Sequence, residues 1–142
     1  MTHEELKAYL PHRDAMLLIG EVEVEDRDGV KTAVGSTHIS GDEWFLQGHF
    51  PGHPVVPGVI LCEILAQSCC LLCNTAGGLP FFAGIKNAKF RRQVRPGDTL
   101  KSECSIVRSL GGFYTAKGVG YVDGEVAVEA DFSFVCKEDE NA

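Results

Sequence analysis

The chain contains 142 residues, 44% of them hydrophobic, and carries a formal net charge of −7 at pH 7. A chain of this size buries about two-thirds of its unfolded surface in one core, so we expect a single domain over residues 1–142. The negative charge argues against nucleic acid as the main partner, because neutralising phosphates requires a basic face. No apolar run reaches the roughly 18 residues that span a bilayer, and the amino terminus lacks a signal-peptide pattern, which predicts a cytoplasmic protein with no membrane partner.

The first predicted elements are a short helix and a β-hairpin. The helix covers Leu6–Leu10 and ends before Pro11, because proline cannot continue a helix comfortably. Strands over Leu17–Glu25 and Val30–Ile39 then flank Asp28-Gly29, which indicates a hairpin turn because glycine tolerates positive φ.

A long apolar run over Val59–Thr75 predicts the one long helix. Pro57 and Gly58 suit its first turn, and Gly77-Gly78 suits its end. The run is hydrophobic on nearly every side, which is typical of a helix buried inside a protein. Other parts of the chain must therefore wrap around it.

Four further strands follow the predicted helix, separated by turns rich in glycine. They cover Phe81–Val94, Thr99–Leu110, Phe113–Val122 and Val126–Cys136. This spacing is typical of an antiparallel meander. One buried helix and about six strands predict an α+β domain, in which a curved antiparallel sheet wraps around one long central helix.

The six cysteines of the chain raise the question of disulfides or a metal site. Cys62, Cys69, Cys70 and Cys73 fall within or beside the apolar run, and the last two form a C-x-x-C motif. No second C-x-x-C motif or histidine pair at ligand spacing follows, and no βαβ pattern surrounds it. We therefore interpret the cysteines as small buried hydrophobes and expect neither a metal nor a redox cofactor.

Basic residues gather in one part of this acidic chain. Between residues 86 and 101 the only acidic residue is Asp98. The basic residues of the same window are Lys86, Lys89, Arg91, Arg92, Arg95 and Lys101. The pattern indicates either a positive patch for an acidic partner or, with equal weight, a strand whose outward residues happen to be charged.

Three chemical functions come together between Gly48 and Glu63. His49 lies in a loop rich in glycine and proline, and its imidazole can accept a proton at neutral pH. Glu63 lies on the apolar helix, where desolvation favours the protonated acid. Backbone N–H groups near Gly58 and Val59 have no partner within the helix and can polarise a carbonyl oxygen.

Each of these candidates also has a structural interpretation. His49 could bond to the backbone, and His53 could be the base instead, although it has no further supporting feature. Glu63 is harder to explain, because an ionisable group among apolar neighbours is costly unless it is paired or used. Gln67 shares its helix face, so a Glu63–Gln67 hydrogen bond could be structural or could orient a catalytic carboxyl group.

The string GHFPGHPVVPGVILCEILAQ, from Gly48 to Gln67, resembles the signature of the FabZ-type 3-hydroxyacyl-acyl carrier protein (ACP) dehydratases. The resemblance extends to Leu10-Pro11-His12-Arg13 and to motifs between residues 83 and 98. It implies a hot-dog fold and a homodimer or a trimer of dimers. The active sites would then lie at the dimer interface, with His49 from one subunit and Glu63 from the other.

The same resemblance implies a function. The expected reaction is dehydration of a (3R)-3-hydroxyacyl thioester to a trans-2-enoyl thioester in type II fatty acid synthesis or a related acyl pathway. This hydro-lyase would use no cofactor, and its substrate would arrive on the phosphopantetheine arm of ACP. The basic residues between Lys86 and Lys101 would dock the acidic carrier, which would chiefly raise the association rate.

The chain departs from the family pattern at three places. Asp14-Ala15-Met16 follows Arg13 where the family usually has Tyr-Pro-Phe. Pro80, Phe81 and Phe82 stand where a gating tyrosine is common, so we take Phe50, Phe81 and Phe82 as tunnel or gate candidates. Lys86 replaces a common aspartate and enlarges the basic patch.

Glu63 favours the FabZ type, because the dehydratase-isomerase branch has aspartate at this position. Three alternatives nevertheless stay open: a bifunctional dehydratase-isomerase, a hot-dog thioesterase and a non-catalytic acyl-binding subunit. The presence of both His49 and Glu63 argues against the silent subunit, which needs neither.

Overall fold

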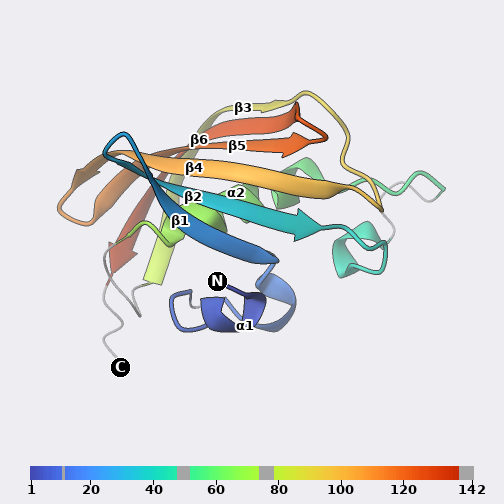
Figure 1. The fold of residues 1–142 in the computed structure, drawn as a ribbon, viewed down its shortest axis with the longest axis horizontal. Helices are drawn as coiled ribbons and strands as arrows, with labels where there is room; N and C mark the ends of the chain where they lie inside the picture. Colours follow the sequence, from blue (N-terminus) through green and yellow to red (C-terminus); the bar gives the residue numbers. More distant parts are fainter. Residues whose placement is uncertain (11, 48–51, 74–78, 138–142) are drawn as a thin grey trace.

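The computed structural model describes residues 1–10, 12–47, 52–73 and 79–137 of the chain. In Figure 1 one curved sheet lies over the helix α2 (Gly58–Cys70), and the short helix α1 (His3–Leu6) lies below the sheet near the amino terminus. The expected α+β architecture, with a curved sheet around one main helix, is confirmed.

The sheet has six antiparallel strands in the order β1-β2-β4-β5-β6-β3. They are β1 (Glu21–Arg27), β2 (Val30–His38), β3 (Leu79–Phe90), β4 (Thr99–Leu110), β5 (Phe113–Val122) and β6 (Glu125–Lys137). The last three strands form the expected meander. β3 does not continue it, because β3 pairs with β6 at the edge of the sheet instead of with β4. The other side of β3 has no strand partner among the described residues.

The first hairpin forms where its turn signal predicts it. Asp28 and Gly29 both have positive φ, at 53° and 84°, and Asp26 Oδ1 accepts a hydrogen bond from the Gly29 N–H at 2.8 Å. Positive φ at the second position favours glycine there. The first strand begins at Glu21 instead of the predicted Leu17 and extends to Arg27.

The bounds predicted for the first helix are wrong. The helix occupies His3–Leu6, because the Thr2 hydroxyl oxygen accepts a hydrogen bond from the Glu5 N–H at 3.2 Å and so caps an earlier start. Serine, threonine, aspartate and asparagine are the preferred residues at the amino-terminal cap of a helix. Leu10 is buried beyond the end of this helix, and Pro11 lies outside the described residues.

The helix α2 is buried along most of its length, as its sequence predicts. Leu61, Ile64 and Leu65 are all at most 2% exposed, and they pack against the inner face of the sheet. Gly118 on β5 permits this approach, because a Cβ atom there would lie 3.3 Å from Leu65 Cβ. The helix ends at Cys70, earlier than predicted, and the predicted stop at Gly77-Gly78 lies outside the described residues.

The cysteines behave as buried hydrophobic side chains. All six are free; three are buried and the others are partly buried. Burial raises the pKa of the Cys62 and Cys70 thiols, which lowers their thiolate content at neutral pH. Within the described ranges, no three His, Cys, Asp or Glu side chains are grouped to hold a metal ion. In the same residues no helix is both long enough and apolar enough to cross a membrane.

Candidate active site

Glu63 and Gln67 lie one turn apart on α2 and form the predicted hydrogen bond. Gln67 Nε2 donates to Glu63 Oε1 at 3.0 Å and to the Met16 carbonyl oxygen at 2.7 Å. Gln67 Oε1 accepts from the Leu18 N–H at 3.0 Å. The Gln67 side chain is 0% exposed, and its three hydrogen bonds join the Glu63 carboxyl group to the 16–18 segment.

A second side chain approaches the same carboxyl oxygen, and the sequence did not single it out. His12 Nε2 lies 3.5 Å from Glu63 Oε1, and the two side chains are 19% and 20% exposed. Burial lowers the pKa of His12, the charge of Glu63 opposes this shift and Arg13 adds to it. His12 was noted only within the Leu10–Arg13 resemblance, since no spacing rule connects it to a helix so far along the chain.

A cavity of about 100 Å³ opens beside these groups. It is lined by His12, Glu63, Ala66, Gln67, Cys70, Pro80, Phe81, Phe82 and Phe134. Most of this lining is apolar, and the carboxyl group is the acid that faces it. The fold therefore places Phe81 and Phe82 in the lining of the cavity that Glu63 also lines, and their role as tunnel or gate residues stays a prediction.

The start of α2 faces a different cavity. Gly58 and Val59 line a space of about 550 Å³ together with Phe90, Arg91 and Arg92, and Glu63 does not line it. Val59 is 76% exposed. Within one chain, the predicted oxyanion-binding groups and the predicted acid thus serve separate cavities.

The predicted base cannot be placed. His49 and Phe50 lie outside the described residues, so their roles stay predictions. The alternative base, His53, is exposed and lines a third cavity of about 740 Å³ with Arg95 and Pro96. Glu63 does not line this cavity, so His53 and the acid of its own chain are not brought together.

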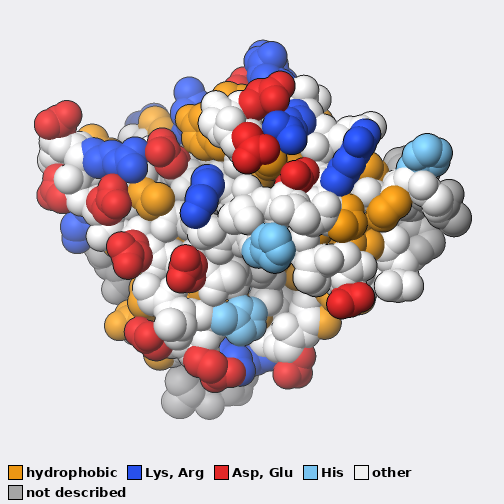
Figure 2. All heavy atoms as spheres, turned by 45° about the vertical axis from the view of Figure 1, so that its right-hand side comes forward, with side chains coloured by type: hydrophobic (Ala, Val, Ile, Leu, Met, Phe, Trp, Pro, Cys, Tyr) orange, Lys and Arg blue, Asp and Glu red, His pale blue; other side chains and the backbone are white. Residues whose placement is uncertain are grey.

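The predicted basic patch is interrupted by acidic side chains that pair with two of its arginines. Arg91 pairs with Glu129 at 3.2 Å. Arg92 pairs with Glu125 at 3.1 Å and lies 3.9 Å from Asp123. Basic and acidic side chains are interspersed on the face shown in Figure 2.

Lys101 does not join the other basic residues at a common cavity. It donates to Ser36 Oγ at 3.2 Å and lines a hollow beside Glu21, Glu23 and Glu25. Lys86 and Lys89 are exposed on β3, and Arg95 is exposed beyond that strand. The described residues thus offer a partly neutralised basic surface around β3 and the segment that follows it.

The fold and the site define a hot-dog domain whose central helix carries a carboxyl group into a largely apolar cavity. The sequence profile of the FabA-like domain matches residues 10–131, and the chain belongs to this family. A 3-hydroxyacyl-[acyl-carrier-protein] dehydratase FabZ of Halalkalibacterium halodurans is 44% identical over 141 residues, which cover 96% of this chain and 99% of that protein. The resemblance noted in the sequence is confirmed.

Solved structures agree on the fold. The dehydratase heterocomplex ApeI:P from Xenorhabdus doucetiae superposes with a TM-score of 0.77 at 19% identity, covering 96% of this chain and 92% of that one. A hypothetical thioesterase from Streptococcus pneumoniae, solved with coenzyme A, has a TM-score of 0.63 at 13% identity and covers 84% of this chain and 88% of that one. The fold is therefore shared by proteins named for different reactions.

Proposed function

We propose that this chain is a (3R)-3-hydroxyacyl-ACP dehydratase that forms trans-2-enoyl-ACP in fatty acid synthesis or a related acyl pathway. The observation that carries the proposal is the Glu63 carboxyl group, held by Gln67 beside a largely apolar cavity. The identity of 44% to a relative with this name supports it. A cytoplasmic location stays a prediction of the sequence.

The reaction needs a base, an acid and a site for negative charge. His49 would remove the α proton of the thioester, and the electron pair of that C–H bond would form the double bond. Backbone N–H groups at Gly58 and Val59 would stabilise the enolate oxygen, each contributing about 3 kcal/mol. Glu63 would give its proton to the departing hydroxyl, which leaves as water.

Two observations support a dimer, or a trimer of dimers, with shared sites. The start of α2 and Glu63 line different cavities within one chain, so a complete site needs the helix start of one copy and the acid of another. The strand β3, which has no second strand partner in the part of the chain that the structure describes, also carries exposed apolar side chains. These include Phe81, Phe82, Ile85 and Phe90. Exposed apolar patches of this kind mark surfaces that bind other proteins.

The same geometry suggests where the carrier approaches. Arg91 and Arg92 line the cavity at the start of α2, where they can meet the phosphate of a phosphopantetheine arm. Lys86, Lys89 and Arg95 are exposed nearby in the chain and would face an acidic carrier. Both arginines already have acidic neighbours, so their free attraction for a carrier is reduced.

Mass spectrometry of the products from 3-hydroxyacyl-ACP substrates tests the proposal. A trans-2-enoyl product supports it. A 3-enoyl product would indicate an isomerase, a free acid would indicate a thioesterase, and no product from any chain length would indicate a binding subunit. Substrates with acyl chains from C4 to C16 would also define the chain-length preference.

A further inference from the structure

One carboxyl oxygen in this site is approached from two sides by nitrogen atoms. Glu63 Oε1 lies 3.0 Å from Gln67 Nε2 on its own helix and 3.5 Å from His12 Nε2. His12 belongs to the amino-terminal segment and not to α2 or to the sheet. The carboxyl group therefore has a neighbour from a segment outside the helix that carries it.

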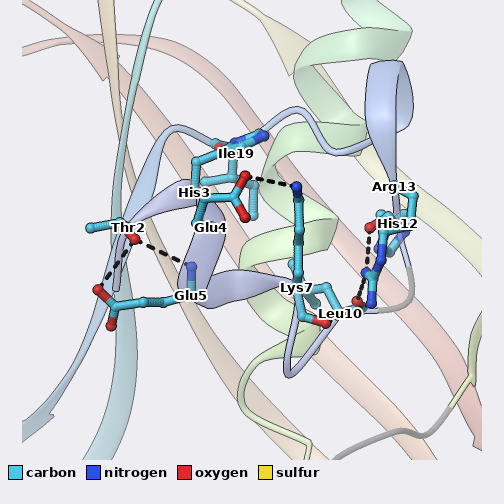
Figure 3. A network of polar contacts seen from close by, with 9 residues as sticks. All are labelled: Thr2, His3, Glu4, Glu5, Lys7, Leu10, His12, Arg13 and Ile19. Atoms are coloured by element: carbon cyan, nitrogen blue, oxygen red, sulfur yellow. Dashed lines mark hydrogen bonds and ion pairs between the residues drawn. The ribbon is translucent and has the colours of Figure 1, made fainter.

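The sequence around His12 explains how its position is fixed. Arg13 Nη1 donates to the carbonyl oxygens of Leu10 at 2.6 Å and His12 at 2.8 Å, and Arg13 Nη2 donates to that of Lys7 at 2.7 Å. Figure 3 shows this guanidinium group folded back against the segment. Leu10 is buried in the core and anchors the segment. Charge-assisted hydrogen bonds of this kind are short and strong, so they hold the backbone of His12 in place.

The electrostatic surroundings favour a neutral imidazole. The charged and titratable groups around it are Glu63 and Cys70 from α2, which share its cavity, and Arg13 from its own segment. Desolvation is the main cause that lowers the pKa of His12. A neutral imidazole with its proton on Nε2 is a donor toward Glu63 Oε1. Such a donor stabilises the carboxylate, which is the form that Glu63 takes after it gives up its proton.

We propose that His12 is a positioning residue, whose Nε2–H group orients the Glu63 carboxyl group and stabilises the carboxylate left by proton transfer to the departing hydroxyl. This inference rests on the proposed acid role of Glu63. His12 acts through Glu63 and does not itself exchange a proton with the substrate. A separation of 3.5 Å is long for a hydrogen bond, and catalytic hydrogen bonds often shorten when substrate binds.

Two amide variants that differ by one methylene group test the proposal. In His12→Gln the amide nitrogen can occupy the place of Nε2, whereas the shorter side chain of His12→Asn stops short of Glu63. We expect His12→Asn to lower kcat about 10-fold with KM changed less than about 2-fold, because the donor acts after binding. His12→Gln should recover most of this loss. Equal kcat values in the two variants would overturn the proposal.

The pH dependence of kcat separates positioning from a purely structural role. His12→Asn lacks the donor that stabilises the carboxylate, so the alkaline limb of its kcat profile should move to higher pH. His12→Gln keeps a donor, so its alkaline limb should not move. Unchanged limbs in both variants would also overturn the proposal. Thermal unfolding of each variant shows whether it is folded.

A Glu63→Gln variant distinguishes this inference from the function on which it rests. If Glu63→Gln keeps near wild-type dehydration, the acid role of Glu63 is wrong and the positioning role of His12 falls with it. If Glu63→Gln is inactive while both His12 variants keep wild-type kcat, only the inference about His12 fails. An inactive Glu63→Gln with a selective loss in His12→Asn supports both.

Discussion

Gln67 connects the Glu63 carboxyl group to the amino-terminal segment. Its buried amide satisfies one backbone donor at Leu18 and one backbone acceptor at Met16, in addition to Glu63. A buried polar group without a partner costs about 1–3 kcal/mol, so this side chain contributes to stability as well as to the site. An apolar side chain in this position would make none of these three hydrogen bonds.

Replacement of Gln67 by leucine tests this double role. We expect Gln67→Leu to lower the free energy of unfolding by about 2–4 kcal/mol, because it leaves the Leu18 N–H and the Met16 carbonyl oxygen unpaired. Dehydration should fall as well, since Glu63 loses a donor. Urea unfolding and initial rates measure the two effects. A loss of stability without any loss of kcat would show that Gln67 has no part in orienting Glu63.

Burial of His12 predicts a pH dependence of stability. Because its pKa is lowered in the folded protein, the unfolded chain binds more protons there, and stability falls as pH drops below the ordinary value near 6.5. His12→Gln has no such proton to bind. The variant should therefore lose less stability than the wild type between about pH 8 and pH 5 in urea titrations. Parallel losses would mean that His12 titrates as it does in the unfolded chain.

At the level of elements, local signals in the sequence predicted more than long-range ones. The Asp28-Gly29 turn and the strands β4 and β5 lie where the sequence places them, because turn chemistry and strand patterning are local. The place of β3 at the edge beside β6 was not predicted, since partner choice depends on how the chain crosses the buried helix.

The site shows the same division. Glu63 and Gln67 share a helix face, so their contact follows from helical spacing. The contact of His12 with Glu63 joins two segments that only the complete fold brings together. Sequence spacing alone contains no information about such a pair.

The close approach of α2 to the sheet makes a prediction about β5. A Cβ atom on Gly118 would lie 3.2 Å from Cys104 Sγ and 3.3 Å from Leu65 Cβ, tighter than ordinary contact. Gly118→Val adds still more atoms there and should destabilise the protein by about 1–3 kcal/mol through overpacking.

Gly124→Ala is a control for glycine loss at a turn, since its Cβ would meet no neighbour within 4 Å. Its φ of 77° adds backbone strain without a packing clash. Thermal unfolding measures the stability of both variants. A Gly118→Val variant as stable as the wild type would contradict the prediction that a side chain at this position overpacks the core.

For the whole molecule, the separation of the helix start from Glu63 within one chain predicts complementation between subunits. His49→Ala and Glu63→Gln should each be inactive as homodimers. After the two variants are unfolded and refolded together, each mixed dimer should contain one intact site. The refolded mixture should then recover up to about a quarter of wild-type activity, because about half of the dimers are mixed and each of these has one of two sites. Gel filtration checks assembly. No recovered activity in verified mixed dimers would contradict a shared site.

The basic surface makes the last prediction, in which Lys101 is the control. Arg91 and Arg95 line the cavities near the start of α2 and the 52–55 segment, whereas Lys101 lies beside the acidic side chains of β1. The double variant Arg91→Gln, Arg95→Glu should lower kcat/KM for carrier-bound substrate at least about 10-fold more than for an N-acetylcysteamine thioester, which lacks the acidic carrier. Glutamine at 91 avoids placing a carboxylate beside Glu129, the present partner of Arg91.

Lys101→Glu should leave the ratio between the two substrates near its wild-type value, because this lysine lines a separate hollow beside Glu21, Glu23 and Glu25. Attraction between exposed charges is screened over about 10 Å at 0.1 M salt, so added salt should reduce the wild-type preference for the carrier substrate. The double variant should show little further response to salt. Equal losses on both substrates would assign Arg91 and Arg95 to the fold or the assembly. Equal effects of the double variant and Lys101→Glu would indicate an unspecific influence of net charge, because docking requires the charges to act from one surface.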